Sequence, residues 1–135
     1  MSRLLCLALV ASFSLAACTS SGGMHDPERL ALYRSHAGLP VRDIRYYNPI
    51  SWEKIDGRHL LLTMRPSEVW LIRLSGPCLE WGGGAPAITI SSRLGRVSSS
   101  FDTVSTVDPP ISCRIEEIRP LDIAAVRDSQ RQAAG

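Results

Sequence analysis

Residues 58–74 read RHLLLTMRPSEVWLIRL, and this stretch decides the predicted fold. Its two apolar runs, 58–64 and 68–74, flank Arg65-Pro66-Ser67, a turn signal in which the missing N–H of proline removes no ladder hydrogen bond. We therefore predict a β-hairpin with a short loop, preceded by a second turn at Asp56-Gly57. Apolar residues fall on both faces of the second run, which indicates a central strand covered on both sides or a strand of a barrel.

Shorter strand candidates follow the hairpin. Turn signals at 75–77, 82–86 and 108–110 separate strands expected at 87–91, within 95–107 and at 112–118, and Arg119-Pro120 ends the last of them. Several short strands with little helix predict an all-β, mainly antiparallel fold, either a small sandwich or a partly open barrel. The residues expected in its core are Trp70, Ile72, Val97, Phe101 and Ile115.

One short helix is predicted before the strands. Asp26 can act as its N-cap, Pro27 suits the first helical position, and Gly38 stops it. Leu30, Tyr33 and Ala37 recur at helical spacing, and so short a helix must dock on another part of the protein. Residues 123–135 form a polar C-terminal tail in which the sequence predicts at most a weak, fraying helix.

The N-terminus is typical of a secretory signal. Arg3 precedes an apolar stretch at 4–15, which is too short for the roughly 20 residues of a membrane-spanning helix. We therefore divide the chain into a removed signal at 1–17, a flexible tether at 18–27, a single folded domain at 28–122 and the tail.

Leu15-Ala16-Ala17-Cys18 resembles the lipobox of bacterial lipoproteins. This resemblance implies that Cys18 becomes the lipidated first residue of the mature protein, with more than one acyl chain and hence stable membrane attachment. Ser20, two places after the cysteine, favours the outer membrane over the inner one in such proteins, facing the periplasm. The alternative is a plain secretory signal cut after Ala17.

Two further cysteines remain for the folded domain. Cys6 leaves with the signal and Cys18 is occupied by lipid, so Cys78 and Cys113 are left in an oxidising compartment where disulfides persist. We predict that they are bonded to each other. The alternatives are two buried free thiols, or a metal site that lacks two further ligands.

The chain also resembles a family of bacterial lipoproteins, domain-of-unknown-function family 6491, over residues 40–122. The most specific parts of this resemblance are the paired cysteines, Cys78 and Cys113, and the closing Arg119-Pro120-Leu121-Asp122. The other residues that carry it are Trp52, Asp56, 69–72, 76–78, 95–97, 101–104 and 113–116. The resemblance implies one extracytoplasmic domain and supplies no activity, cofactor or catalytic residue.

Composition argues against several function classes. The formal net charge is +2, from 15 basic and 13 acidic residues, with no long run of like charge. Such a chain lacks the field of a nucleic-acid binder, and its few Cys and His residues predict neither a metal site nor a cofactor.

Three motifs with catalytic or anion-binding potential favour simpler interpretations. His59 follows Asp56-Gly57, but no Gly-x-Ser-x-Gly elbow accompanies it, so we expect a polar residue at a strand edge. Adjacent Glu116 and Glu117 face one substrate as an acid/base pair only if a bulge intervenes; otherwise they are solvated charges paired with Arg114 or Arg119. Residues 82–84, all glycine, lack a P-loop lysine or a dinucleotide fingerprint and indicate a loop.

Aromatic and basic residues gather at 42–58, where Tyr46, Tyr47 and Trp52 form a candidate binding patch. Tyr, Trp and Arg commonly anchor protein interfaces, so this face suits an envelope protein, a glycan or a lipid headgroup. The alternative is that these aromatics fill the core.

Two function classes follow. The favoured one is a non-enzymatic, lipid-anchored binding or assembly module of the cell envelope. The other is a small envelope hydrolase whose site is not recognisable from the sequence, and a pocket where His59 meets a carboxylate and a hydroxyl would favour it.

Overall fold

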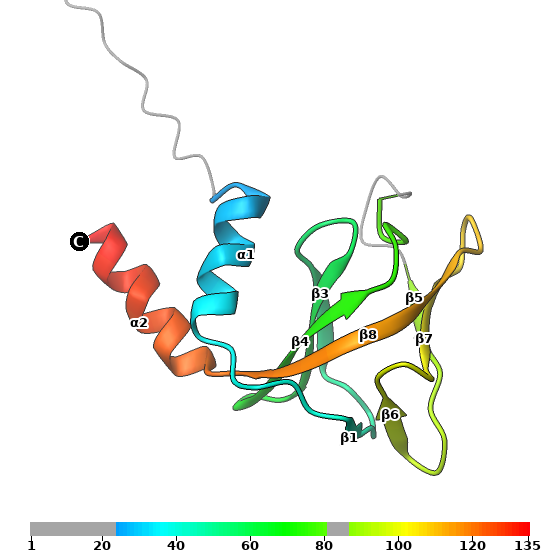
Figure 1. Cartoon of the computed structure of the whole chain (residues 1–135). Helices are drawn as coiled ribbons and strands as arrows, with labels where there is room; N and C mark the ends of the chain where they lie inside the picture. Colours follow the sequence, from blue (N-terminus) through cyan, green and yellow to red (C-terminus); the bar gives the residue numbers. More distant parts are fainter. Residues whose placement is uncertain (1–23, 81–86) are drawn as a thin grey trace, which may run out of the picture.

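The computed structural model describes residues 24–80 and 87–135 (Figure 1). The predicted signal, Cys18, the tether up to residue 23 and the glycines at 82–84 lie outside the described residues. The elements, in chain order, are α1 (Asp26–Ser35), β1 (Asp43–Arg45), β2 (Ser51–Lys54), β3 (His59–Arg65), β4 (Glu68–Leu74), β5 (Ile88–Ile90), β6 (Arg96–Ser98), β7 (Thr103–Thr106), β8 (Ser112–Leu121) and α2 (Ile123–Ala134). No helix among these is long and apolar enough to cross a membrane.

Six strands form one antiparallel sheet in the order β2-β3-β4-β8-β7-β5, and β1 and β6 form a separate pair. The sheet curls into a half-barrel, with both helices on one side of it (Figure 1). The predicted class, a mainly antiparallel fold in its partly open barrel form, is confirmed. Because the sheet does not close, β2 and β5 are its two end strands.

The β3–β4 hairpin is buried on both faces, as its sequence predicts. Side chains that point inside the half-barrel, such as Leu62 and Ile72, belong to an interior core. Their neighbours on the opposite face, such as Leu61 and Leu71, pack in a second core against Tyr33 of α1. The near-continuous apolar run therefore serves two cores at once, the interior of the sheet and the layer of helices.

Both helices dock on that outer face. α1 begins at Asp26 with His25 as its N-cap, so the predicted cap Asp26 lies instead in the first turn, where an acidic side chain suits the helix dipole. At the other end of the chain the carboxylate of Asp122 accepts from the amide of Ala125 (3.0 Å) and caps α2. Val126 is buried against the sheet, so the predicted polar tail is a docked helix.

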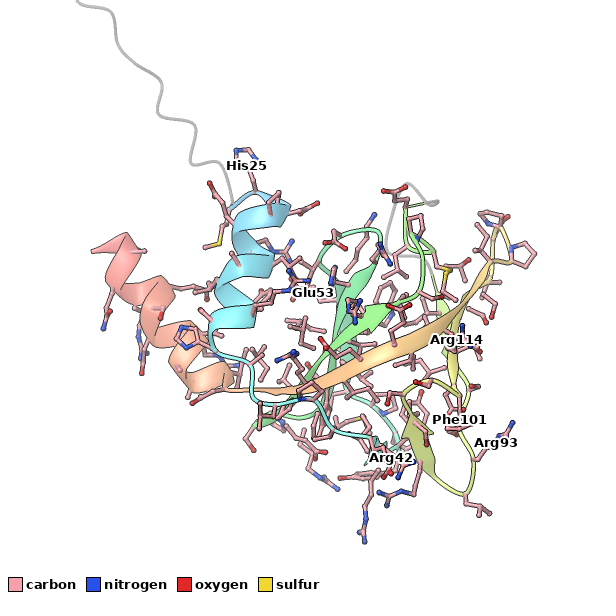
Figure 2. The ribbon with its side chains drawn as sticks, in the orientation of Figure 1. His25, Arg42, Glu53, Arg93, Phe101 and Arg114 are labelled. Atoms are coloured by element: carbon pink, nitrogen blue, oxygen red, sulfur yellow. A yellow bond between two sulfur atoms is a disulfide. The ribbon has the colours of Figure 1, made fainter. Side chains whose placement is uncertain are left out.

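Three expectations for the β region are wrong. Phe101 is 71% exposed (Figure 2), because residues 99–102 form the turn between β6 and β7 and break the alternation on which its predicted burial rested. Trp70 is only half-buried, at the edge of the interior core. β8 continues through Pro120 to Leu121: the Pro120 carbonyl accepts from the Gly38 amide (2.8 Å), so its ring nitrogen faces away from β4 and no ladder bond is lost.

Candidate functional site

The open seam of the half-barrel holds an apolar crevice of about 180 Å³. Its lining comes from both end strands of the sheet, from β3 and from the segment before β2, and consists of Tyr46, Pro49, Ile50, Ser51, Trp52, Leu62, Ile88 and Ile90. Small-molecule pockets typically enclose roughly 300–1,000 Å³. A space of this size suits one bulky apolar group better than a whole metabolite.

Two of the three predicted patch aromatics border this crevice. Tyr46 and Trp52 are half-buried and pack against the interior core, so these two aromatics fill part of the core and leave part of their surface exposed. Burial raises the pKa of the Tyr46 hydroxyl above its ordinary value of 10.0, so this group stays neutral. The neighbouring Ile50 is 60% exposed and forms an apolar rim.

Tyr47, the third patch residue, lies elsewhere. Its hydroxyl accepts from Nε of Arg65 (3.0 Å), and the Arg65 guanidinium lies 4.8 Å from the ring centroid. This cation–π contact ties Tyr47 to the tip of the β3–β4 hairpin. The structure therefore brings Tyr46 and Trp52 together at one site and leaves Tyr47 outside it.

His59 is the first residue of β3 and is buried. Its Nδ1 lies 2.9 Å from both carboxylate oxygens of Asp56, and its Nε2 lies 3.2 Å from Nη2 of Arg34. A guanidinium has only donors, so Nε2 accepts from Arg34 and Nδ1 carries the proton that bonds Asp56. The nitrogen that a hydrolase would use as its base is thus engaged by a cation, and no hydroxyl contacts it within the described residues.

Asp56 is itself fixed by its surroundings. Partial burial on its own would raise the pKa of this carboxyl, but hydrogen bonds from the Arg58 amide (2.7 Å) and from the ring and amide of His59 outweigh it and lower the pKa. The carboxylate therefore stays ionised and holds the imidazole in one orientation.

Glu116 and Glu117, weighed above as an acid/base pair, are both bound by arginines. Glu117 accepts from Nε (2.8 Å) and Nη2 (3.2 Å) of Arg119, and Glu116 accepts from Nη1 of Arg73 (2.9 Å). The hydrogen bond from Arg119 lowers the pKa of Glu117, which makes it a poor proton donor. The pairing with Arg119 was expected; the pairing of Glu116 is with Arg73 and not with Arg114.

Arg34 and Arg73 were not predicted from the sequence as site residues. For Arg73 the sequence does hold an indication of a site, because this charged residue interrupts the apolar run Leu71-Ile72-Arg73-Leu74 in a strand buried on both faces. Nothing in the sequence marks Arg34 as a site residue, since the last turn of a helix often holds a basic residue.

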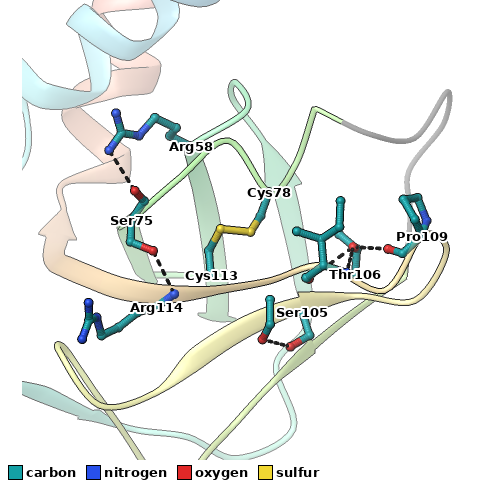
Figure 3. Close-up of a disulfide and its surroundings, with 10 residues drawn as sticks. Arg58, Ser75, Cys78, Ser105, Thr106, Pro109, Cys113 and Arg114 are labelled. Atoms are coloured by element: carbon teal, nitrogen blue, oxygen red, sulfur yellow. Dashed lines mark hydrogen bonds between the residues drawn. A yellow bond between two sulfur atoms is a disulfide. The ribbon is translucent and has the colours of Figure 1, made fainter.

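Cys78 and Cys113 form a disulfide with their Cα atoms 6.0 Å apart, as predicted (Figure 3). The bridge joins the segment after β4 to β8, next to a polar junction at Ser75. The Ser75 hydroxyl accepts from the Arg114 amide (3.1 Å), and its carbonyl accepts from the Arg58 guanidinium (3.2 Å). A disulfide and a hydrogen bond therefore both join the segment after β4 to β8.

Comparison with known proteins adds one finding to this geometry. Neither a curated protein nor a solved structure matches the chain. A family does: the one described as "Family of unknown function (DUF6491)" matches residues 1–135. This agrees with the resemblance carried by the paired cysteines and the closing Arg-Pro-Leu-Asp motif, and extends it to the whole sequence. The chain therefore belongs to the DUF6491 family.

Proposed function

We propose that this protein is a lipid-anchored envelope protein, attached through Cys18 to the outer membrane on its periplasmic side, and that it acts as a non-enzymatic binding or assembly module. The proposed contact surface is the apolar crevice at the open seam of the half-barrel. The observation that carries this proposal is the seating of Tyr46 and Trp52 on the core with the exposed Ile50 beside them.

The chemistry of the crevice favours a protein partner. Aromatic side chains already held by packing lose little conformational entropy when they bind, and Tyr and Trp are enriched among the residues that dominate interface energies. The crevice occupies about six times the ~30 Å³ share of one liquid water, which is room for a single large side chain. On either side lie β2 and β5, and within residues 24–80 and 87–135 no further strand pairs with their outer edges. Such edges accept an extended polypeptide by strand addition.

The lipobox at 15–18 supports the anchoring part of the proposal. The engagement of His59 by Arg34 supports a binding role over a hydrolytic one, because the ring nitrogen that would act as the base already accepts from a guanidinium.

Co-purification tests the proposal with a matched pair of surface variants. Ile50 and Val107 are 60% and 61% exposed, and only Ile50 lines the crevice. Protein purified from membranes in mild detergent should carry a stoichiometric partner that Ile50→Asp loses and Val107→Asp keeps. A partner retained by both variants, or lost by both, would show that the crevice is not the contact surface.

A further inference from the structure

A second cavity, of about 360 Å³, lies on the outer face of the sheet beside the C-terminal end of α1. Four charged side chains line it. Arg34 comes from the last turn of α1, Arg73 from β4, and Glu117 and Arg119 from β8. Arg73 and Glu117 are direct cross-strand partners, so the register of the sheet builds one wall of the cavity.

Carboxylates and backbone hold two of these arginines in place. Glu117 receives two hydrogen bonds from Arg119, whose Nη1 also donates to the Gly38 carbonyl (3.3 Å). Arg73 is held by Glu116 at 2.9 Å and approaches Glu117 at 3.9 Å. Three guanidinium groups and one carboxylate, Glu117, thus line the cavity, and Glu116 pairs with Arg73 beside it.

Among the described residues, Arg34 is the one of these three guanidinium groups with no carboxylate paired to it directly. Within residues 24–80 and 87–135, no carboxylate lies within 4.0 Å of its guanidinium, and its side-chain partner is the neutral Nε2 of His59. Asp56 fixes the other ring nitrogen of His59. The ionised Asp56 therefore orients the Arg34 guanidinium through the imidazole and not by a direct ion pair, in the way that outer-shell groups orient metal ligands.

We propose that this cavity binds the phosphate group of a phosphate ester, with Arg34 as the principal contact and with Arg73 and Arg119 completing the positive wall. The planar fork of a guanidinium matches two phosphate oxygens, and such paired, charge-assisted hydrogen bonds are strong. The volume falls within the roughly 300–1,000 Å³ of ligand pockets and leaves room for a small organic group. His59 and Asp56 are positioning residues that act through Arg34.

This site is separate from the apolar crevice. The crevice opens from the interior side of the half-barrel, whereas the arginines share the outer face with the helices. Phosphate esters reach an envelope protein from two sources, as soluble metabolites or as membrane lipid headgroups. Both present the same oxyanion to Arg34.

The test is calorimetric titration of the full-length protein in dodecyl maltoside micelles, which carry no phosphate. The two probes are glycerol 3-phosphate and a short-chain phosphatidylglycerol. Binding of the first alone identifies a soluble phosphate ester, binding of the second alone identifies a headgroup, and binding of both supports the shared chemistry. Saturable binding of neither probe at millimolar concentration overturns the proposal.

Variants test the residue assignment. Arg34→Gln should weaken binding at least about tenfold, the loss expected for charge-assisted hydrogen bonds. Arg34→Lys should also weaken it, because the charge remains while the fork is lost. The matched control is Arg93→Gln, an exposed arginine outside the cavity (Figure 2). Equal weakening by Arg93→Gln and Arg34→Gln contradicts a built site, as does full affinity in Arg34→Lys.

Two further measurements complete the test. One probes the positioning role of His59, and the other uses wild-type protein and so does not depend on the folding of a variant. His59→Gln should weaken binding while leaving all three arginines present. On wild-type protein, NMR of arginine side chains requires no substitution at all. Addition of glycerol 3-phosphate should shift guanidinium signals of Arg34, Arg73 and Arg119, and a spectrum in which these three stay unmoved contradicts the proposal.

Discussion

Ile115 and Ile118 of β8 both lie fully buried in the interior core, although residues three apart on a regular strand point to opposite faces. They share a face because the register between β4 and β8 slips at this point, which inserts one extra residue into β8. The slip also brings adjacent carboxylates to one cation: Glu116 and Glu117 lie 2.9 and 3.9 Å from Arg73. A bulge in the sheet therefore builds the charged wall of the outer cavity.

The stability of the protein should fall in acid partly through Glu117. The pKa of this carboxyl is held below its ordinary value of 4.5 by Arg119, so its contribution to the free energy of unfolding is present above pH 4.5 and is lost as the pH falls through the lower, folded-state pKa. Urea midpoints measured between pH 3 and 7 should therefore drop less steeply for Glu117→Gln than for wild type. Identical slopes would mean that the Glu117–Arg119 pair contributes nothing to acid sensitivity.

The disulfide should contribute much of the stability of the folded domain. Its cysteines are separated by 35 residues, and a closed loop of that length corresponds to about 4 kcal/mol in the chain-entropy relation. Reduction of wild type should lower the urea midpoint to that of the Cys78→Ser, Cys113→Ser double variant, which should not respond to reductant. Two reactive thiols from these positions in denatured, unreduced mature protein would contradict the bond.

Gly38 should tolerate no side chain. Its amide donates to the Pro120 carbonyl, and a Cβ atom there would lie 2.9 Å from Cγ of the Pro120 ring, which is too rigid to move aside. We expect Gly38→Ala to destabilise the protein by roughly 1–3 kcal/mol, the usual cost of overpacking. Gly135→Ala is the control, because its Cβ would meet nothing closer than 3.7 Å. Equal unfolding free energies for the two variants would contradict the close approach of residue 38 to β8.

Anchoring should depend on Cys18. Cys18→Ser should leave the protein in the soluble periplasmic fraction or unprocessed, because the substitution removes the thiol that we propose receives the lipid. Membrane fractionation and intact-mass measurement check this. A Cys18→Ser protein that stays in membranes with the acyl mass of wild type would rule out the lipoprotein assignment.

The sequence predicted the fold best where the pattern of apolar residues and the turn residues indicated the same strands. The hairpin of β3 and β4 was placed to within a residue, because two apolar runs flank a Pro-Ser turn. The sequence did not predict β1 and β2. They span three and four residues, and of these residues only Ile44 in β1 is buried. Strands so short carry no periodic signal, and only pairing with β6 and β3 makes them strands.

The candidate sites were harder to predict, because both arise from residues far apart in the chain. Trp52 and Ile88 line the same crevice only because the sheet curls and brings its two end strands to either side of it. Arg34 meets His59 only because α1 docks on the outer face. The bond between Cys78 and Cys113 was predictable, because counting the cysteines left a single pair.

The most direct test of the proposed binding role is site-specific photo-crosslinking in intact cells. A photoreactive amino acid at Ile50, on the rim of the crevice, is compared with one at Val107, which is equally exposed and does not line it. We predict a discrete, ultraviolet-dependent adduct of one partner protein at position 50 and not at position 107. Absence of an adduct at position 50, or the same adducts at both positions, would contradict the assignment of the crevice as the binding surface.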